Sequence, residues 1–434
     1  MRVSNTYFPL LGLVLSCSAS AATFAEYQQI QQQSPNQVQI IDCRDSNFYN
    51  GWPQNAMKSG GHVPGAISLD ANWLNQTSPH ALSNLVMSKS ISNKKQTFLY
   101  CGEKKAQSLA HALKSQGINN IKIITQPIDQ YHGKLSALPR FQHLVPAWWL
   151  NDLIKGKNPL YAPKNGYKVV EVAWGPPAKY LLAHILGAYY LNTNDIESEP
   201  WWNRVSPKQL KQVINDFGLR YDTTVILYGR DNTAAARAAN ILMYAGVKDV
   251  RLLNSGWQSW VDAGYCSEPM LNENHNKVDF GKPIPANPNY IIDVPQAKAL
   301  LKQPKDQQSL VSIRSWAEYT GETSGYSYIK PKGRIPGSKW GHAGSDPYHL
   351  EDLRNPDGTM RSPNEIAQLW QQWDIKPNQD VAFYCGSGWR ASEAFFDAYL
   401  MGWKNISVFD GGWYQWSGDK SNPTAHGDIK PSKQ

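Results

Sequence analysis

The stretch Tyr384-Cys385-Gly386-Ser387-Gly388-Trp389-Arg390-Ala391-Ser392 places a thiol between an apolar run and a helical stretch. Residues 381–384, just before the thiol, predict a buried strand, and residues 391–400 have the composition of a helix. The loop glycines let backbone amides turn inward, while the helix dipole and Arg390 favour an anion there. We therefore expect Cys385 to be a thiolate nucleophile held by loop amides.

The residues after this stretch continue the alternation of strand, turn and helix. Gly402 predicts a helix stop, residues 406–409 a second strand, and residues 410–416, Asp-Gly-Gly-Trp-Tyr-Gln-Trp, a turn into another helix. The loop from Cys385 to Arg390, followed by this Gly-Gly-Trp element, resembles the C-terminal half of a rhodanese domain. The resemblance implies that the thiolate takes the outer sulfur of a donor as a persulfide, which a nucleophilic acceptor then removes.

The same resemblance implies which residues form the site. Cys385 is then the nucleophile, and the implied substrate-binding residues are Gly386, Ser387, Gly388, Trp389, Arg390 and Arg314. For Trp389 the favoured interpretation is packing against a neighbouring domain, and for Arg390 an ordinary salt bridge is an equal alternative. Ser312 stands where the family usually has Asp, so the hydrogen bonding around Arg314 is left open. The resemblance implies no metal and no cofactor.

Two motifs recur along the chain. One occurs at residues 61–66, 183–188 and 333–338, where rhodanese-like domains have the turn into a strand. In the second half of the unit, residues 225–228 match 381–384 and residues 255–260 match 411–416. This alignment places glycine 229 where the third unit has its cysteine, so we expect the middle unit to be inactive.

The first unit keeps a cysteine, Cys101, directly after the apolar residues 97–100. Its loop lacks the second glycine and the arginine, and it is one residue short, since Cys101 precedes Gly117 by 16 residues whereas Cys385 precedes Gly402 by 17. We interpret this unit as structural. A reactive Cys101 remains an alternative. For Cys43 and Cys101 we favour separate, buried thiols, with their pairing in an oxidising compartment as the alternative.

The repeats divide the chain into tandem domains. We expect a signal peptide at residues 1–22, a first rhodanese-like domain at 23–144, a second at 145–282 and a catalytic third at 283–434. Apolar runs alternate with helical stretches in each unit. The predicted fold class is therefore α/β, with each domain a parallel sheet flanked by helices.

The N-terminal residues predict export. Arg2 precedes an apolar stretch at residues 7–15, and small residues follow at 16–22, with cleavage expected after Ala21 or Ala22. A lipoprotein signal is the alternative, disfavoured by a poor match before its cysteine. We therefore expect a periplasmic protein.

Composition restricts the function classes. The chain of 434 residues is 41% apolar and 18% charged, and no internal run approaches the length of a membrane span. The formal charge of +8 can draw small anions, but there is no basic block and the tryptophans are scattered. The cysteines have neither metal-ligand spacing nor the density of a disulfide scaffold. We expect no nucleic-acid partner and no membrane span.

Over nearly all of the mature chain the sequence resembles secreted bacterial thiosulfate sulfurtransferases with three rhodanese domains. This implies thiosulfate, a small sulfur-containing anion, as donor and cyanide or a thiol as acceptor; a protein donor or acceptor is also open. Two alternatives are a 3-mercaptopyruvate sulfurtransferase, which Cys-Gly-Ser-Gly resembles, and a persulfide carrier that serves a protein partner. A cysteine phosphatase is disfavoured, because those enzymes have five residues between cysteine and arginine, and four separate Cys385 from Arg390.

Overall fold

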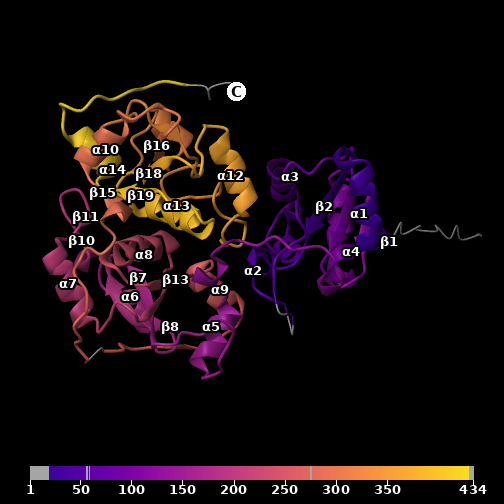
Figure 1. Ribbon diagram of the computed structural model, residues 1–434, viewed down its shortest axis with the longest axis horizontal. Coiled ribbons are helices and arrows are strands. Elements are labelled where there is room, and N and C mark those ends of the chain that lie inside the picture. Colours follow the sequence, from indigo (N-terminus) through magenta and orange to yellow (C-terminus); the bar gives the residue numbers. More distant parts are fainter. Residues whose placement is uncertain (1–18, 55–56, 58, 274–275, 430–434) are drawn as a thin grey trace, which may run out of the picture. The chain divides into compact units, whose positions relative to one another are not determined.

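The computed structural model describes residues 19–54, 57, 59–273 and 276–429 (Figure 1). These residues form two compact units. The first consists of residues 1–45 and 63–134, and the second of residues 46–62 and 135–434, within those described ranges. No helix among the described residues is long and apolar enough to cross a bilayer.

The first unit contains one five-stranded sheet in which every strand pairing is parallel. Its strands, in spatial order, are β1 (Ser20–Ala22), β5 (Ile121–Ile124), β4 (Gln96–Tyr100), β2 (Val38–Asp42) and β3 (Ile67–Ser68). Its helices are α1 (Phe24–Gln33), α3 (Pro79–Ser88) and α4 (Glu103–Ser115). The central strands β2 and β4 are almost wholly buried, as expected when helices cover both faces of a parallel sheet.

The edge strand β1 bears on the expected signal peptide. Ser20, Ala21 and Ala22 pair with β5, and the Thr23 side chain caps α1 by accepting a hydrogen bond from the Glu26 amide at 3.1 Å. The expected cleavage after Ala21 or Ala22 therefore falls inside or at the end of a strand. Residues 1–18 of the expected signal lie outside the described residues.

The second unit contains two further five-stranded parallel sheets. In spatial order the strands of one are β6 (Leu144–Val145), β13 (Asp249–Leu253), β12 (Thr224–Tyr228), β7 (Tyr167–Ala173) and β9 (Tyr189–Asn192). Those of the other are β15 (Ile291–Ile292), β19 (Ile406–Phe409), β18 (Asp380–Tyr384), β16 (Gln308–Ser312) and β17 (Lys339–Trp340). Two short antiparallel pairs accompany them: β10 (Glu197–Ser198) with β11 (Asn203–Arg204), and β8 (His184–Ile185) with β14 (Ser267–Glu268).

Helices flank both of these sheets. The helices around the middle sheet are α2 (Ser46–Asn50), α5 (Ala147–Ile154), α6 (Ala178–Leu182), α7 (Pro207–Asp216), α8 (Asn232–Ala245) and α9 (Gly256–Asp262). Those around the third sheet are α10 (Val294–Leu300), α11 (Trp316–Thr320), α12 (Pro363–Gln371), α13 (Trp389–Leu400) and α14 (Gly412–Gly418).

The three sheets share one strand order, which confirms the predicted α/β fold with repeated parallel sheets. In each sheet the central strand is the one that the sequence placed before the loop: β4 ends before Cys101, β12 before Gly229 and β18 before Cys385. Carboxyl ends of central strands are where parallel sheets form ligand sites. The fold therefore places all three loops at the position where a site is expected.

Helices α8 and α13 pack side by side and join the middle and third domains (Figure 1). Helix α8 is rich in alanine, and every residue from Thr233 to Ala245 is buried. Small side chains let the two helices approach closely, so that one apolar core extends through both domains. The loop that begins at Cys385 leads directly into α13 and is held against the middle domain.

Candidate active site

Cys385 follows the last residue of β18 and is fully buried. The backbone amide of Gly388 donates a hydrogen bond to its Sγ at 3.2 Å. Gly388 has φ +98, a conformation that favours glycine, and α13 begins at the next residue. The thiol thus lies at the N-terminus of a twelve-residue helix, where amides and the helix dipole stabilise negative charge.

The Gly-Gly-Trp element holds the loop from the other side. The amide of Trp413 donates to the carbonyl of Cys385 at 2.8 Å, and the amide of Tyr414 donates to that of Gly386 at 3.0 Å. Gly412 has φ +53, and a Cβ there would lie 2.7 Å from the Cys385 carbonyl oxygen. The start of α14 therefore fixes the direction of the loop carbonyls, and only glycine fits at position 412.

Arg390 and Arg314 meet on one carboxylate. Arg390 donates from Nη1 and Nη2 to the two oxygens of Glu318 at 2.8 and 2.9 Å. The Nε of Arg314 lies 3.4 Å from Oε1 of Glu318, and its Nη1 donates to the carbonyl of Gly333 at 2.8 Å. All three side chains are buried. Burial alone raises the pKa of Glu318, but Arg390 and Arg314 outweigh it and lower that pKa to about 2.

This cluster leaves one positive charge beside the thiol. Two guanidinium groups face a single carboxylate, and Cys385 is among the groups that act electrostatically on Arg390. The Nε of Arg390 and the Nη2 of Arg314 are buried without a hydrogen-bond partner among the described residues. A thiolate or persulfide on Cys385 would balance the surplus charge. Of the two sequence-predicted arginines, Arg390 interacts with Cys385, and Arg314 is connected to Arg390 through Glu318.

Ser387 and Trp389 make different contacts. The hydroxyl of Ser387 lies 3.3 Å from that of Tyr328, whose pKa burial raises to about 12, so that the phenol stays protonated. The indole Nε1 of Trp389 donates to Glu197 of the middle domain at 2.8 Å. This contact agrees with the interpretation of Trp389 as a residue that packs against a neighbouring domain.

Sequence reasoning missed several residues that contact the candidate site. Arg237 of α8 donates from Nε to Glu197 at 2.9 Å and also pairs with Asp410 of the Gly-Gly-Trp turn. A Cβ on Gly388 would lie 3.1 Å from Nη1 of Arg237, so the arginine supports the loop from the middle domain.

Glu318 had a local signal in the sequence, since its side chain and that of Ser315 form a capping box at the start of α11. Arg237 and Glu197 had none, because their contacts join residues far apart in the chain.

The equivalent positions in the other domains hold no free thiol. In the middle domain the Trp257 amide donates to the Gly229 carbonyl at 3.0 Å, as Trp413 does in the third, and a Cβ on Gly229 would lie 2.3 Å from the Asp231 carbonyl oxygen. In the first unit Cys101 forms a disulfide with Cys43. The expectation of separate thiols at these two positions is therefore wrong, because the ends of β2 and β4 bring the two cysteines within disulfide distance, with their Cα atoms 5.0 Å apart.

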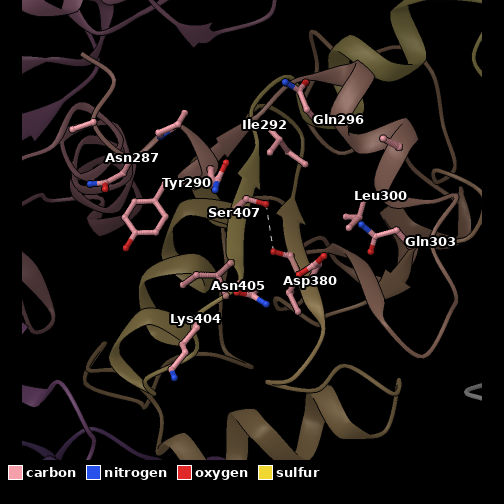
Figure 2. Close-up of a pocket in the computed structure, with 16 residues that line it drawn as sticks. Asn287, Tyr290, Ile292, Gln296, Leu300, Gln303, Asp380, Lys404, Asn405 and Ser407 are labelled. Atoms are coloured by element: carbon pink, nitrogen blue, oxygen red, sulfur yellow. Dashed lines mark hydrogen bonds between the residues drawn. The ribbon is translucent and has the colours of Figure 1, made fainter. Parts of the chain in front are cut away.

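Two cavities lie near the third sheet. One, of about 540 Å³, lies at the amino ends of β18 and β19, where Asp380 and Lys404 line it and the Ser407 hydroxyl donates to the Val381 carbonyl (Figure 2). The other, of about 630 Å³, is lined by Ser387 and further residues of the cysteine loop. Only the second is at the carboxyl end of the sheet, where parallel sheets bind ligands. No group of three or more His, Cys, Asp or Glu side chains in the described residues is placed to hold a metal ion.

A family model assigns the chain. The model for the rhodanese-like domain matches residues 23–134, 149–263 and 293–419. The chain belongs to the rhodanese family. This match confirms the resemblance that the loop and the repeats indicated.

A full-length relative supports the enzyme class. The rhodanese chain is 48% identical over 435 residues to the thiosulfate sulfurtransferase YnjE of Escherichia coli, covering 99% of each protein. The prediction of a thiosulfate sulfurtransferase agrees with the name of this relative. The chain is therefore a sulfurtransferase of the rhodanese family.

Solved structures resemble the whole fold. The crystal structure of YnjE matches with a TM-score of 0.90 and 49% identity, covering 95% of this rhodanese and 98% of that chain. The anaerobic ergothioneine biosynthesis enzyme from Chlorobium limicola, in complex with its natural substrate trimethyl histidine, matches with a TM-score of 0.89 and 38% identity, covering 95% and 100%. A structure of EanB at the same TM-score and identity has ergothioneine covalently linked with a persulfide cysteine.

Proposed function

We propose that Cys385 takes the sulfane sulfur of thiosulfate as a persulfide and passes it to cyanide or a thiol. The observation that supports this most directly is the placement of Cys385 Sγ under the Gly388 amide, with Arg390 acting on it electrostatically. Arg390 shares the carboxylate of Glu318 with a second arginine, Arg314. Such a site stabilises a sulfur anion by preorganised charge and amides.

The two steps balance in atoms and charge. The Cys385 thiolate attacks the outer sulfur of thiosulfate, the sulfur–sulfur bond breaks, and sulfite leaves with the electron pair. Cyanide or a thiolate then attacks the outer sulfur of the persulfide, and the electron pair returns to Cys385 as thiolate. The surplus positive charge of the Arg314, Glu318 and Arg390 cluster stabilises the anion in both states.

The assignment of Cys385 is tested with matched cysteine variants. Cys385→Ser should abolish both thiosulfate-to-cyanide transfer and the gain of one sulfur atom that mass spectrometry detects on the intact protein. Cys266→Ser is the control, because Cys266 is the exposed free cysteine of the described residues. Cys101→Ser should retain transfer. Near-full activity of Cys385→Ser, or abolition only in Cys101→Ser, contradicts the proposal.

The donor is tested by parallel initial rates. We propose thiosulfate rather than 3-mercaptopyruvate as the donor, because sulfite departs as a dianion. The surplus positive charge beside Cys385 stabilises such a dianion more than it stabilises a leaving group of lower charge. Far faster turnover of mercaptopyruvate than of thiosulfate would contradict the assignment of thiosulfate as donor. It would not contradict the proposed persulfide on Cys385. Multiple turnover with a small donor and cyanide separates an enzyme from a carrier that only a protein partner can load.

A further inference from the structure

The cavity at the amino ends of β18 and β19 lies outside the candidate active site (Figure 2). Its volume is about 540 Å³, within the range of small-molecule sites, and none of its described lining residues belongs to the cysteine loop. Asp380 begins β18 and Cys385 follows the last residue of that strand, so the two sites lie at opposite ends of the sheet. The walls of this cavity, compared with the same place in the middle domain, indicate its ligand.

Strand pairing aligns the middle and third domains residue by residue. The first residue of β6 pairs with Leu252, and the first residue of β15 pairs with Val408. Counting back one residue along each central strand neighbour, Arg251 corresponds to Ser407. The short side chain of Ser407 therefore stands in the third domain where the middle domain has a buried arginine.

In the middle domain Arg251 fills this place and is fully paired. Its Nε and Nη2 donate to the Asp249 carboxylate at 3.0 and 2.8 Å, and its Nη1 donates to the Tyr161 carbonyl at 2.8 Å. The guanidinium carbon also lies 5.1 Å from the ring centroid of Trp149. The fold thus accommodates a guanidinium group at this end of a sheet when oxygen acceptors surround it.

The third domain lacks the groups that fill this space in the middle domain. Trp149 corresponds to Gln296, because each lies five residues after the start of its edge strand. The connection from α5 to β7, residues 155–166, supplies the covering carbonyl, whereas the connection from α10 to β16, residues 301–307, is shorter. Ser407 and Gln296 both line the cavity. The cavity therefore lies where the middle domain has the arginine, its aromatic partner and its covering loop.

The oxygen acceptors remain in the third domain. Asp380 precedes the residue whose amide donates to the Asn405 carbonyl at 2.9 Å, so these two residues lie on neighbouring strands. Side chains alternate along β18, and Asp380 therefore faces the α10 side of the sheet, as Ala382 does. In the described part of the chain, the side chains of Asp380, Asn405 and Gln303 make no hydrogen bond or ion pair. A carboxylate and two carboxamide oxygens are thus available to a cation with several donors.

Lys404 does not neutralise the Asp380 carboxylate. Both residues line the cavity, but no ion pair joins them within the described ranges, and Figure 2 shows the Lys404 side chain directed away from Asp380. The cavity therefore carries a negative charge and a positive charge at separate places. This separation suits a ligand that has a cationic group and an anionic group joined by a stem.

We propose that this cavity binds free arginine, with the guanidinium group in the place that Arg251 occupies in the middle domain. The planar fork of a guanidinium matches a carboxylate, so it bonds Asp380 and the carboxamides beside it. The aliphatic stem packs on Leu300, and the free carboxylate faces Lys404. The inference does not rest on the proposed sulfur transfer, because no group of the cysteine loop takes part.

Arginine binding to the full chain tests the site. Isothermal titration with arginine should show saturable binding, whereas citrulline, which carries a neutral urea group of the same shape, should bind at least about tenfold more weakly. Asp380→Asn should weaken arginine binding at least about tenfold, and it should fold because Asp380 is exposed. Asp306→Asn removes an exposed carboxylate that does not line the cavity, and it should leave arginine binding unchanged.

A second variant rebuilds the arrangement of the middle domain. Ser407→Arg supplies the guanidinium from the chain itself, so it should abolish the binding of added arginine. Thermal unfolding shows that each variant is folded before its binding is measured. Blocked arginine, with an acetylated amine and a methylamide in place of the carboxylate, should bind more weakly than free arginine because it lacks the group that faces Lys404.

The outcomes decide both the site and the source of the guanidinium. Absence of saturable arginine binding to the unmodified protein, or equal binding of citrulline, would overturn the proposal. Unchanged arginine binding by folded Asp380→Asn or folded Ser407→Arg would also overturn it, since the ligand would then lie elsewhere. Tighter binding of blocked than of free arginine would overturn the free amino acid as the ligand in favour of an arginine within a peptide.

Discussion

At the scale of residues, one shared carboxylate decides the electrostatics beside Cys385. The sequence indicated Arg390 and Arg314 as substrate ligands, but each guanidinium contacts Glu318 in the folded protein. Removal of Glu318 would leave two buried arginines without their common partner. Breaking a buried ion pair on one side destabilises a protein strongly, because the remaining charge is uncompensated.

Glu318→Gln should lower the free energy of unfolding at pH 7 by about 3 kcal/mol or more. The pKa of Glu318 is lowered from its ordinary value of 4.5 to about 2 in the folded protein, so its stabilisation is present above about pH 4.5 and is lost as pH falls toward 2. The difference in free energy of unfolding between the unmodified protein and Glu318→Gln should therefore become smaller as the pH is lowered. Denaturant unfolding at neutral and acidic pH measures it. Glu322→Gln, an exposed carboxylate on the same segment, is the control; a pH-independent deficit in Glu318→Gln would contradict this account.

At the scale of elements, the repeated motifs predicted more than any single residue did. The match of Gly229 and Cys101 to Cys385 placed three loops at the ends of central strands, and the sheets confirm it. A strand, a turn and a capping signal are local, so spacing in the sequence reveals them. Contacts such as that of Arg237 with Asp410 join residues 173 positions apart, and local pattern has no access to them.

The Gly-Gly-Trp turn is predicted to be essential for sulfur loading. Gly412→Ala would place a Cβ at 2.7 Å from the Cys385 carbonyl oxygen and force a side chain into φ +53. We expect at least tenfold slower loading of Cys385, because the loop must move. Gly264→Ala is the matched control, since Gly264 has φ +67 with nothing within 4 Å of its Cβ position. Equal loss of loading in both variants would show that backbone strain, and not contact with the loop, is responsible.

At the scale of the whole molecule, three copies of one fold have taken different roles. The third domain holds the free thiol, while the middle domain supplies Arg237, Glu197 and one wall of the cavity beside the cysteine loop. The sequence showed that the middle domain lacks a cysteine, and from this we predicted only that it is inactive. That it completes the site could not be predicted, because walls formed by two domains appear only after α8 packs on α13.

The first unit should depend on its disulfide for stability. Cys43 and Cys101 are separated by 58 residues, and closing a loop of that length contributes about 4 kcal/mol on the chain-entropy model. In the double variant Cys43→Ala, Cys101→Ala, the first unit should therefore unfold at a lower denaturant concentration than in the unmodified protein. Proteolysis with mapping of the cleavage sites measures the unfolding of this unit. Transfer from Cys385 should persist in the absence of denaturant, where both units are folded. Loss of transfer under those conditions would show that Cys101 or Cys43 takes part in the reaction.

Export is the last prediction, and the disulfide and strand β1 together refine it. Disulfides persist in oxidising compartments such as the periplasm, and the N-terminal residues have the pattern of a signal peptide. Cleavage after Ala22 would remove β1 from the edge of its sheet, whereas cleavage after Ala19 leaves Ser20–Ala22 paired with β5 and keeps a small residue on the signal side of the cut. We therefore predict a periplasmic protein that begins at Ser20. N-terminal sequencing of the mature protein, together with thiol labelling before and after reduction, checks both points: an intact Met1 with Cys43 and Cys101 reduced would place the protein in the cytoplasm and move its sulfur supply to an intracellular donor.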